Sequence, residues 1–146
     1  MKEDIVKKYV RDLDGLEKEV KLFKQRFLNL PEEPDWDYLL PCYHESVIFF
    51  FSVIYKYLVF EELPIFSGGK GLDAWIEYEG NVMDVEFEVL SSDFPNHHTD
   101  EEKEKCKMIV CWKDNSRKKH EFWKHIDVFE LRHFWERANQ NAEMRE

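Results

Sequence analysis

Three carboxylates near the middle of the chain have the residue types and the spacing of a cation site. Residues 72–79 alternate apolar and polar side chains, and a second strand-like run, residues 82–90, follows a Gly-Asn turn signal. Glu86 and Glu88 share one face of the second strand, because side chains two residues apart point to the same side. We expect Asp73, on the first strand, to lie across from them. Carboxylates this close raise one another's pKa unless a cation compensates, and Mg²⁺ is commonly bound by one or two of them.

The same hairpin has a simpler interpretation, in which its acidic residues form a solvated face. Antiparallel sheets usually keep one face wet, and the opposite face of this hairpin carries Val85, Phe87 and Val89 as a candidate core. Composition does not separate the two interpretations. The segments on either side of the hairpin favour the cation site.

An acid on one strand, Glu-x-Lys on the next, and then a helix and a buried strand form the core pattern of the PD-(D/E)xK, or restriction-endonuclease-like, nuclease superfamily. The chain resembles this pattern over residues 42–135: Asp73 matches the first acid and Glu86 the second. Glu45 lies in the apolar segment ESVIFFFSVIYKYLVF, where the superfamily often has a helix-borne Glu. The downstream segments SSDFPNHH, KCKMIVCW and HIDVFELRHFW resemble a mostly uncharacterised group within it that has a Glu-x-Glu variant motif.

The resemblance implies a fold, a chemistry and a set of site residues. The expected fold is α/β, with a restriction-endonuclease-like mixed sheet flanked by helices. The expected activity is hydrolysis of nucleic-acid phosphodiester bonds, with DNA as the expected substrate and Mg²⁺ (or Mn²⁺) as the cofactor. Asp73, Glu86 and Glu88 are the implied metal ligands and catalytic residues, and Glu45 is implied to support them.

One departure from the pattern leaves a second function open. The lysine of Glu-x-Lys is absent, because position 88 is Glu. That lysine usually orients the attacking water or stabilises charge on the phosphate, and its place falls to one of Lys70, Lys103, Lys105 and Lys107. The alternative is a catalytically inactive nuclease fold that acts as a binding or assembly module.

Candidate contacts to nucleic acid lie in loops. Either His97 or His98, in a polar loop, is a candidate to contact the scissile phosphate or to shuttle protons near neutral pH. Basic residues interleaved with aromatic ones can hold a phosphate backbone and stack a base, although a solvated loop is the commoner outcome. The formal net charge of −10 argues against tight sequence-independent binding. The basic candidates are Lys70, Arg117, Lys118 and Lys119.

The first 30 residues carry a heptad pattern. From Val6 to Leu30, apolar residues recur at alternating steps of three and four, which is the period of a coiled-coil seam. Gly15 is a weak point in this predicted helix. Two interpretations remain open: a helix that packs along its own domain, and a homodimer contact. We therefore divide the chain into an N-terminal helix, residues 1–30, and a restriction-endonuclease-like domain, residues 31–146.

The other elements follow from their local patterns. We expect a buried helix over residues 42–58, a helix that starts at Thr99, and a closing helix over residues 133–144. Residues 108–112 form a continuous apolar run, which is typical of a strand buried on both faces, and residues 126–131 predict another strand.

Composition limits the class of protein. A chain of 146 residues with 43% hydrophobic and 16% aromatic content predicts a folded domain. The N-terminus is too polar for a signal peptide and residues 47–60 are too short to span a bilayer, so we expect a cytoplasmic protein without a membrane partner. Potential zinc ligands are present but match no zinc spacing: Cys42, His44, His97, His98 and Cys106. We therefore expect the three cysteines, Cys42, Cys106 and Cys111, to be buried, reduced thiols.

Overall fold

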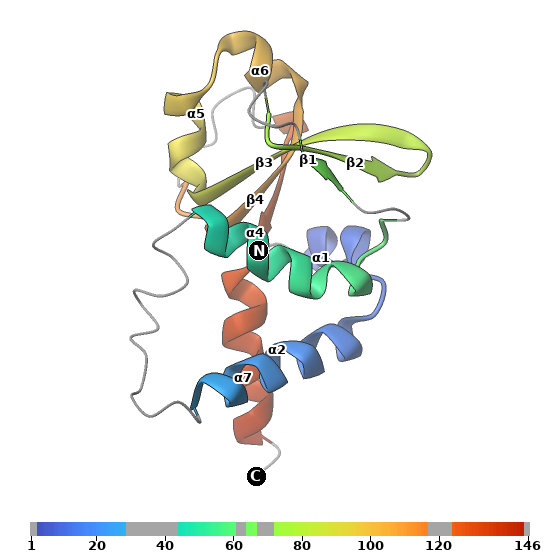
Figure 1. Cartoon of the computed structure of the whole chain (residues 1–146), viewed down its shortest axis with the longest axis vertical. Coiled ribbons are helices and arrows are strands. Elements are labelled where there is room, and N and C mark those ends of the chain that lie inside the picture. The colour runs from blue at the N-terminus through green and yellow to red at the C-terminus, as the bar shows by residue number, and fades with distance from the viewer. Residues whose placement is uncertain (1–2, 29–43, 61–63, 67–71, 117–123, 145–146) are drawn as a thin grey trace.

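The computed structural model describes residues 3–28, 44–60, 64–66, 72–116 and 124–144, and Figure 1 shows their arrangement. Side chains are described in these ranges except for residues 27, 28, 97 and 139–144. The strands are β1 (Ile65–Phe66), β2 (Ala74–Tyr78), β3 (Asn81–Leu90), β4 (Cys106–Lys113) and β5 (Asp127–Glu130). The helices are α1 (Glu3–Tyr9), α2 (Leu13–Leu28), α4 (His44–Ile54), α5 (Phe94–His97), α6 (Asp100–Lys105) and α7 (Arg132–Met144), with short 3₁₀ turns η1 (Tyr55–Tyr57) and η2 (Ser91–Asp93).

The strands form one mixed sheet in the order β1-β2-β3-β4-β5. The β1–β2 and β2–β3 pairs are antiparallel, whereas the β3–β4 and β4–β5 pairs are parallel. A parallel pair needs a long crossover, and η2, α5 and α6 supply it between β3 and β4. The α/β class and the mixed sheet flanked by helices are therefore confirmed.

The predicted hairpin is present, with its turn one residue earlier than the Gly-Asn signal indicates. Tyr78 pairs with Asn81, so Glu79 and Gly80 form the two-residue turn. Both have positive φ angles, 51° and 79°, as a tight hairpin turn with the right-handed strand twist requires. Ala74 pairs with Val85, and this register places Asp73, immediately before β2, next to Glu86.

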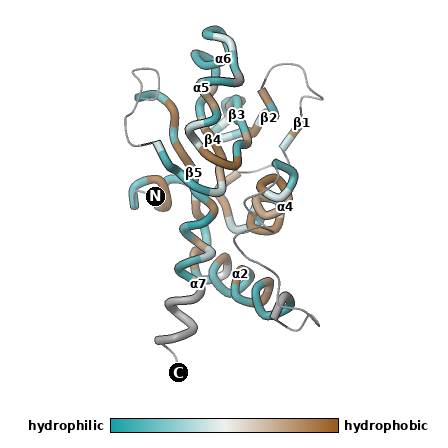
Figure 2. Tube along the Cα trace, turned by 90° about the vertical axis from the view of Figure 1, so that its left-hand side faces the viewer, coloured by the Kyte–Doolittle hydropathy of each residue, from teal (hydrophilic) through white to brown (hydrophobic). Residues whose placement is uncertain are grey.

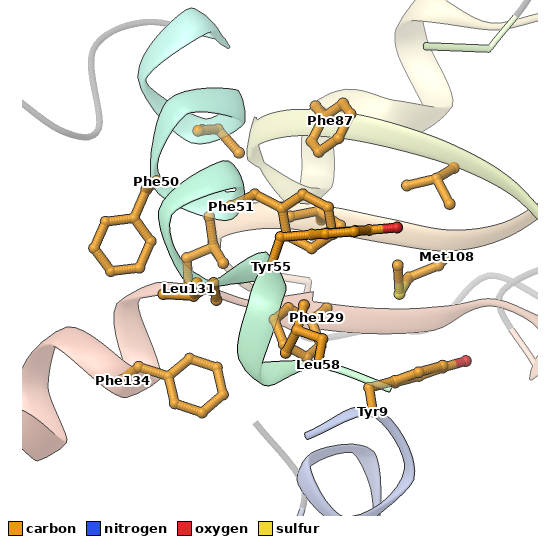
Figure 3. Packing of buried hydrophobic residues seen from close by; sticks show 14 of the residues in the cluster. Tyr9, Phe50, Phe51, Tyr55, Leu58, Phe87, Met108, Phe129, Leu131 and Phe134 are labelled. Atoms are coloured by element: carbon orange, nitrogen blue, oxygen red, sulfur yellow. The ribbon is translucent and has the colours of Figure 1, made fainter. Parts of the chain in front are cut away.

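The sheet separates two hydrophobic clusters. On one face, α4 packs its aromatic residues against β3 and β5, and Phe51 lies 5.4 Å from Phe87 between ring centroids (Figure 3). On the other face, a smaller cluster includes Leu72, Phe94 and Ile109. The central strand β4 contributes to both clusters and is buried on both faces, as predicted. Figure 2 shows the contrast between α4, which is largely hydrophobic, and the polar α6.

The prediction of one continuous N-terminal helix is wrong. The helix is interrupted between α1 and α2, where the backbone N–H groups of Arg11 and Asp12 donate to the carbonyl of Tyr57. Gly15 then allows a close approach: a Cβ there would lie 2.4 Å from Asp12 Oδ2 and 2.8 Å from Tyr57 Cε1. A heptad pattern is compatible with two consecutive helices, because the step of three or four residues says nothing about an intervening backbone pairing.

The heptad stripe packs on its own chain. Tyr9, Leu16 and Val20 are all buried in the main core cluster, and α2 crosses α7 below the sheet (Figure 1). Phe23 lies 6.1 Å from Trp135 between ring centroids. Of the two interpretations of the stripe, the structure favours packing along its own domain over a homodimer contact.

Among the residues that the structure describes, no helix has both the length and the apolar character needed to cross a membrane.

Cys106 and Cys111 are free and buried, as predicted, and burial raises the pKa of both thiols. Cys42 lies outside the described residues.

Candidate metal centre

Four separate segments bring titratable side chains to one place beside β3. The strand itself presents Glu86 and Glu88 on the face opposite Phe87, as the period of two predicts. Asp73 lies immediately before β2, and His44 is the first residue of α4. His98 follows α5 directly, and the next residue, Thr99, is the N-cap of α6.

The solvated-face interpretation does not hold for the two glutamates of β3. Glu86 is only 5% exposed and Glu88 only 7%. Within the sheet they lie beside β4, where Glu86 pairs in register with Ile109 and Glu88 with Cys111. A carboxylate removed from water is costly unless it is protonated, hydrogen-bonded or paired with a cation, so this burial requires compensation.

Asp73 is held by three contacts. Its Oδ2 atom lies 3.0 Å from His44 Nε2 and accepts a hydrogen bond of 2.9 Å from the backbone N–H of Phe87. Its own backbone N–H donates to Glu86 Oε2 at 2.9 Å. The hairpin backbone thus fixes the positions of both acids, while the start of α4 adds an imidazole.

His98 occupies the other end of the cluster. Its Nε2 atom lies 3.0 Å from Glu86 Oε1 and 3.4 Å from Glu88 Oε1. The ring is packed against Phe94, with 4.8 Å between centroids, and the side chain is 8% exposed. On its opposite edge, Nδ1 lies 3.6 Å from Glu102 Oε2.

The protonation of the cluster follows from burial and from these neighbours. Burial and the adjacent Asp73 raise the pKa of Glu86 to about 9. Burial and the charge of Asp93 raise the pKa of Glu88 to about 7. Burial acts to raise the pKa of Asp73 as well, but the hydrogen bonds from His44 and Phe87 outweigh it and lower that pKa. The hydrogen bond to Asp73 also raises the pKa of His44.

Without a metal, the cluster therefore holds a proton at neutral pH. The preferred state pairs ionised Asp73 with His44 and keeps Glu86 protonated. A bound cation can replace that proton, because it stabilises both carboxylates in their charged form.

The side chains form two overlapping candidate cation groups. His44, Asp73 and Glu86 make one, and Glu86, Glu88 and His98 make the other, with the ligand atoms of each group within 4.8 Å of one another. The sequence predicts one ion held by Asp73, Glu86 and Glu88. The geometry instead distributes these acids over two groups that share Glu86 and adds a histidine to each. Imidazole with carboxylate oxygens is a donor set that fits a divalent cation.

The other predicted site residues lie elsewhere or outside the described part. Glu45 is exposed on α4, and neither candidate group includes it. His97 lies in α5 with its side chain outside the described residues, and its neighbour His98 occupies the site instead. The basic candidates Lys70, Arg117, Lys118 and Lys119 also lie outside the described residues.

The lysines considered as replacements for the one absent at position 88 have other described contacts. Lys103 lies 3.7 Å from Asp100, and Lys105 lies 3.1 Å from Glu101, both within α6. Lys107 is exposed at the start of β4. The His98 imidazole is one described basic group that lies close to Glu88.

The sequence predicts His44 only in part. It adjoins Glu45 at the start of a buried helix, and its residue type can bind zinc, although its spacing matches no zinc pattern. The turn of α4 relative to the hairpin brings it, rather than Glu45, onto Asp73.

Comparison of the chain with models of protein families, with curated proteins and with solved structures gives no match.

Proposed function

We propose that the protein is a metal-dependent nuclease that hydrolyses phosphodiester bonds in nucleic acid, with DNA as the expected substrate. The observation that carries the proposal is the buried Glu86, which accepts a hydrogen bond from the backbone N–H of Asp73. The half-buried Asp73 carboxylate in turn contacts the His44 imidazole. The order of elements supports it: α4, the antiparallel strands β1 to β3, the α5–α6 crossover and β4 follow the order that the nuclease resemblance implies.

In this proposal, residues of the cluster have different roles in phosphodiester hydrolysis. His44, Asp73 and Glu86 would hold a divalent cation, and such an ion would supply polarisation of a phosphate and a lower pKa for an attacking water. The backbone N–H of Phe87 holds Asp73 in place, and Glu86, whose pKa is raised to about 9, would have to be ionised to bind the cation. Glu88, with a pKa of about 7, is suited to accept a proton from water near neutral pH.

Glu88 also favours the second candidate function, a binding or assembly module without cleavage. A lysine at this position would aim a positive group at the charge that develops on the phosphate, and loss of one preorganised contact of that kind typically costs about 10²–10³ in rate. The acidic net charge of −10 points the same way. We therefore expect cleavage to be slow.

A cleavage assay separates the two functions. Purified protein is incubated with single-stranded, double-stranded and branched DNA and with RNA, in Mg²⁺, in Mn²⁺ and in EDTA. We expect cleavage only with a divalent cation, and expect Glu86→Gln to abolish it. Glu77→Gln, in the same hairpin but in neither candidate group, is the matched control and should cleave like the wild type. If the wild type leaves every substrate intact with both metals, the nuclease proposal is wrong and the module remains.

A gain-of-function variant tests the explanation for slow cleavage. Glu88→Lys restores the residue of the common pattern and should retain or raise the rate. A complete loss of cleavage in this variant, with the fold intact by circular dichroism, would show that Glu88 itself is required.

A further inference from the structure

The second candidate group, which consists of Glu86, Glu88 and His98, contains a buried ring nitrogen. His98 presents Nε2 to Glu86 and Glu88, while its other ring nitrogen, Nδ1, is buried and has no hydrogen-bond partner within the described part of the chain. A buried polar atom without a partner is uncommon and costs free energy. This atom faces Glu102 Oε2 at 3.6 Å, slightly beyond hydrogen-bond range.

Glu102 is held in this position by the start of α6. Its side chain accepts a hydrogen bond of 3.1 Å from the backbone N–H of Thr99, and its own N–H donates to Thr99 Oγ1 at 3.2 Å. This reciprocal capping box fixes a carboxylate behind the imidazole. Metal-binding histidines almost always donate their second ring N–H to a carboxylate, a carbonyl or water, which sets the tautomer and orients the ring. Glu102, His98 and the two buried glutamates are arranged in that order.

We propose that Glu86, Glu88 and His98 bind a second divalent cation, with Glu102 as the positioning residue behind His98. The ion lies beside the one held by His44, Asp73 and Glu86, because the two groups share Glu86. The catalytic role of this second ion rests on the proposed nuclease function. The ion would bring positive charge to position 88, where the nuclease pattern has lysine. The imidazole favours a transition-metal ion such as Mn²⁺ over Mg²⁺, which prefers oxygen ligands and water.

Counting bound Mn²⁺ tests the proposal without reference to cleavage. The free ion is measured by its paramagnetic resonance signal during titration of the whole chain. We expect two ions per chain in the wild type and one in His98→Ala and in His44→Ala. His125→Ala, an exposed histidine outside both groups, should still bind two. A single ion in the wild type, or two in His98→Ala, would overturn the proposal.

A milder variant guards against loss of the fold. Glu102→Gln keeps a side-chain oxygen to accept from Thr99 N–H but removes the charge behind His98. It should weaken only the second binding step, by about 10–100-fold, which is the usual effect of losing such a partner. Equal affinities for both steps in Glu102→Gln and the wild type would contradict the positioning role. With Mg²⁺ in excess, the His98-dependent Mn²⁺ should stay bound, and its displacement would overturn the selectivity.

The cleavage assay and the ion count fail independently. Two ions without any cleavage would contradict the nuclease function and leave the second site intact. Cleavage with a single ion would contradict the second site and leave the nuclease function intact.

Discussion

Burial distinguishes Glu86 and Glu88 from the exposed Glu79 and the partly exposed Glu77 of the same hairpin. The residue type and the spacing are the same, but only the β3 pair lies beneath the crossover that carries His98. A glutamate that is protonated when folded and ionised when unfolded makes stability depend on pH, and both residues have raised pKa values.

We predict that the metal-free protein loses stability as the pH rises. The pKa of Glu86 moves from an ordinary 4.5 to about 9 and that of Glu88 to about 7. The folded state therefore holds protons that the unfolded chain has released. Their stabilising contribution is full below about pH 4.5 and is lost as the pH rises through the folded pKa values. Each group lowers the free energy of unfolding by at most about 1.4 kcal/mol per pH unit within its window.

Urea unfolding in EDTA at several values between pH 5 and pH 8 measures this slope. Glu86→Gln cannot ionise, so its free energy of unfolding should vary less with pH, whereas Glu77→Gln should behave like the wild type. A wild-type stability that is constant or rises over this range would show that Glu86 is ionised in the metal-free protein.

At the scale of elements, the N-terminal region shows how a regular pattern leads to the wrong helix length. The pattern correctly marks the buried stripe on α1 and α2, with Leu16 and Val20 fully buried. It does not mark the interruption, because that depends on backbone hydrogen bonds to η1 far along the chain. The capping box of α6 behaves differently: Thr99 and Glu102 are three residues apart, so the start of that helix is predictable from sequence.

We predict that Val20→Asp destabilises the protein itself and does not produce a folded monomer from a dimer. Val20 is fully buried in the core cluster, and an unpaired carboxylate there should cost roughly 3 kcal/mol or more. Leu22→Asp, on the same helix with Leu22 56% exposed, should change the stability by no more than about 0.5 kcal/mol. Chemical unfolding and light scattering check both variants. A folded Val20→Asp monomer derived from a dimeric wild type would restore the dimer interpretation.

At the scale of the whole molecule, the candidate metal centre draws on segments that are far apart in the chain. The side chains that could hold a cation come from α4, from the segment before β2, from β3 and from the segment between α5 and α6. A cation bound by the folded state but not by the unfolded chain therefore stabilises the whole domain.

We predict that Mn²⁺ raises the melting temperature, and raises it more at pH 8 than at pH 6. An ion present at 100 times its dissociation constant adds about 2.7 kcal/mol per site. Protons compete for Glu86 and Glu88, so the gain should increase with pH while the metal-free stability falls. Differential scanning calorimetry with Mn²⁺ and with EDTA measures it. Asp73→Asn should lose much of the gain, and Asp14→Asn, an exposed acid on α2, should keep it. An equal gain in both variants would exclude Asp73 from the cation site.

The sequence by itself determined the hairpin, the central strand β4, the start of α6 and the two acids on one face of β3. These features depend on backbone geometry over a few residues, and period two or a three-residue capping box carries that information. Only the tertiary structure decided that Glu86 and Glu88 are buried, that His44 takes the position expected of Glu45, and that His98 lies over β3. Burial and convergence depend on how α4 and the crossover pack against the sheet. Contacts between segments distant in the chain leave no local period from which to predict them.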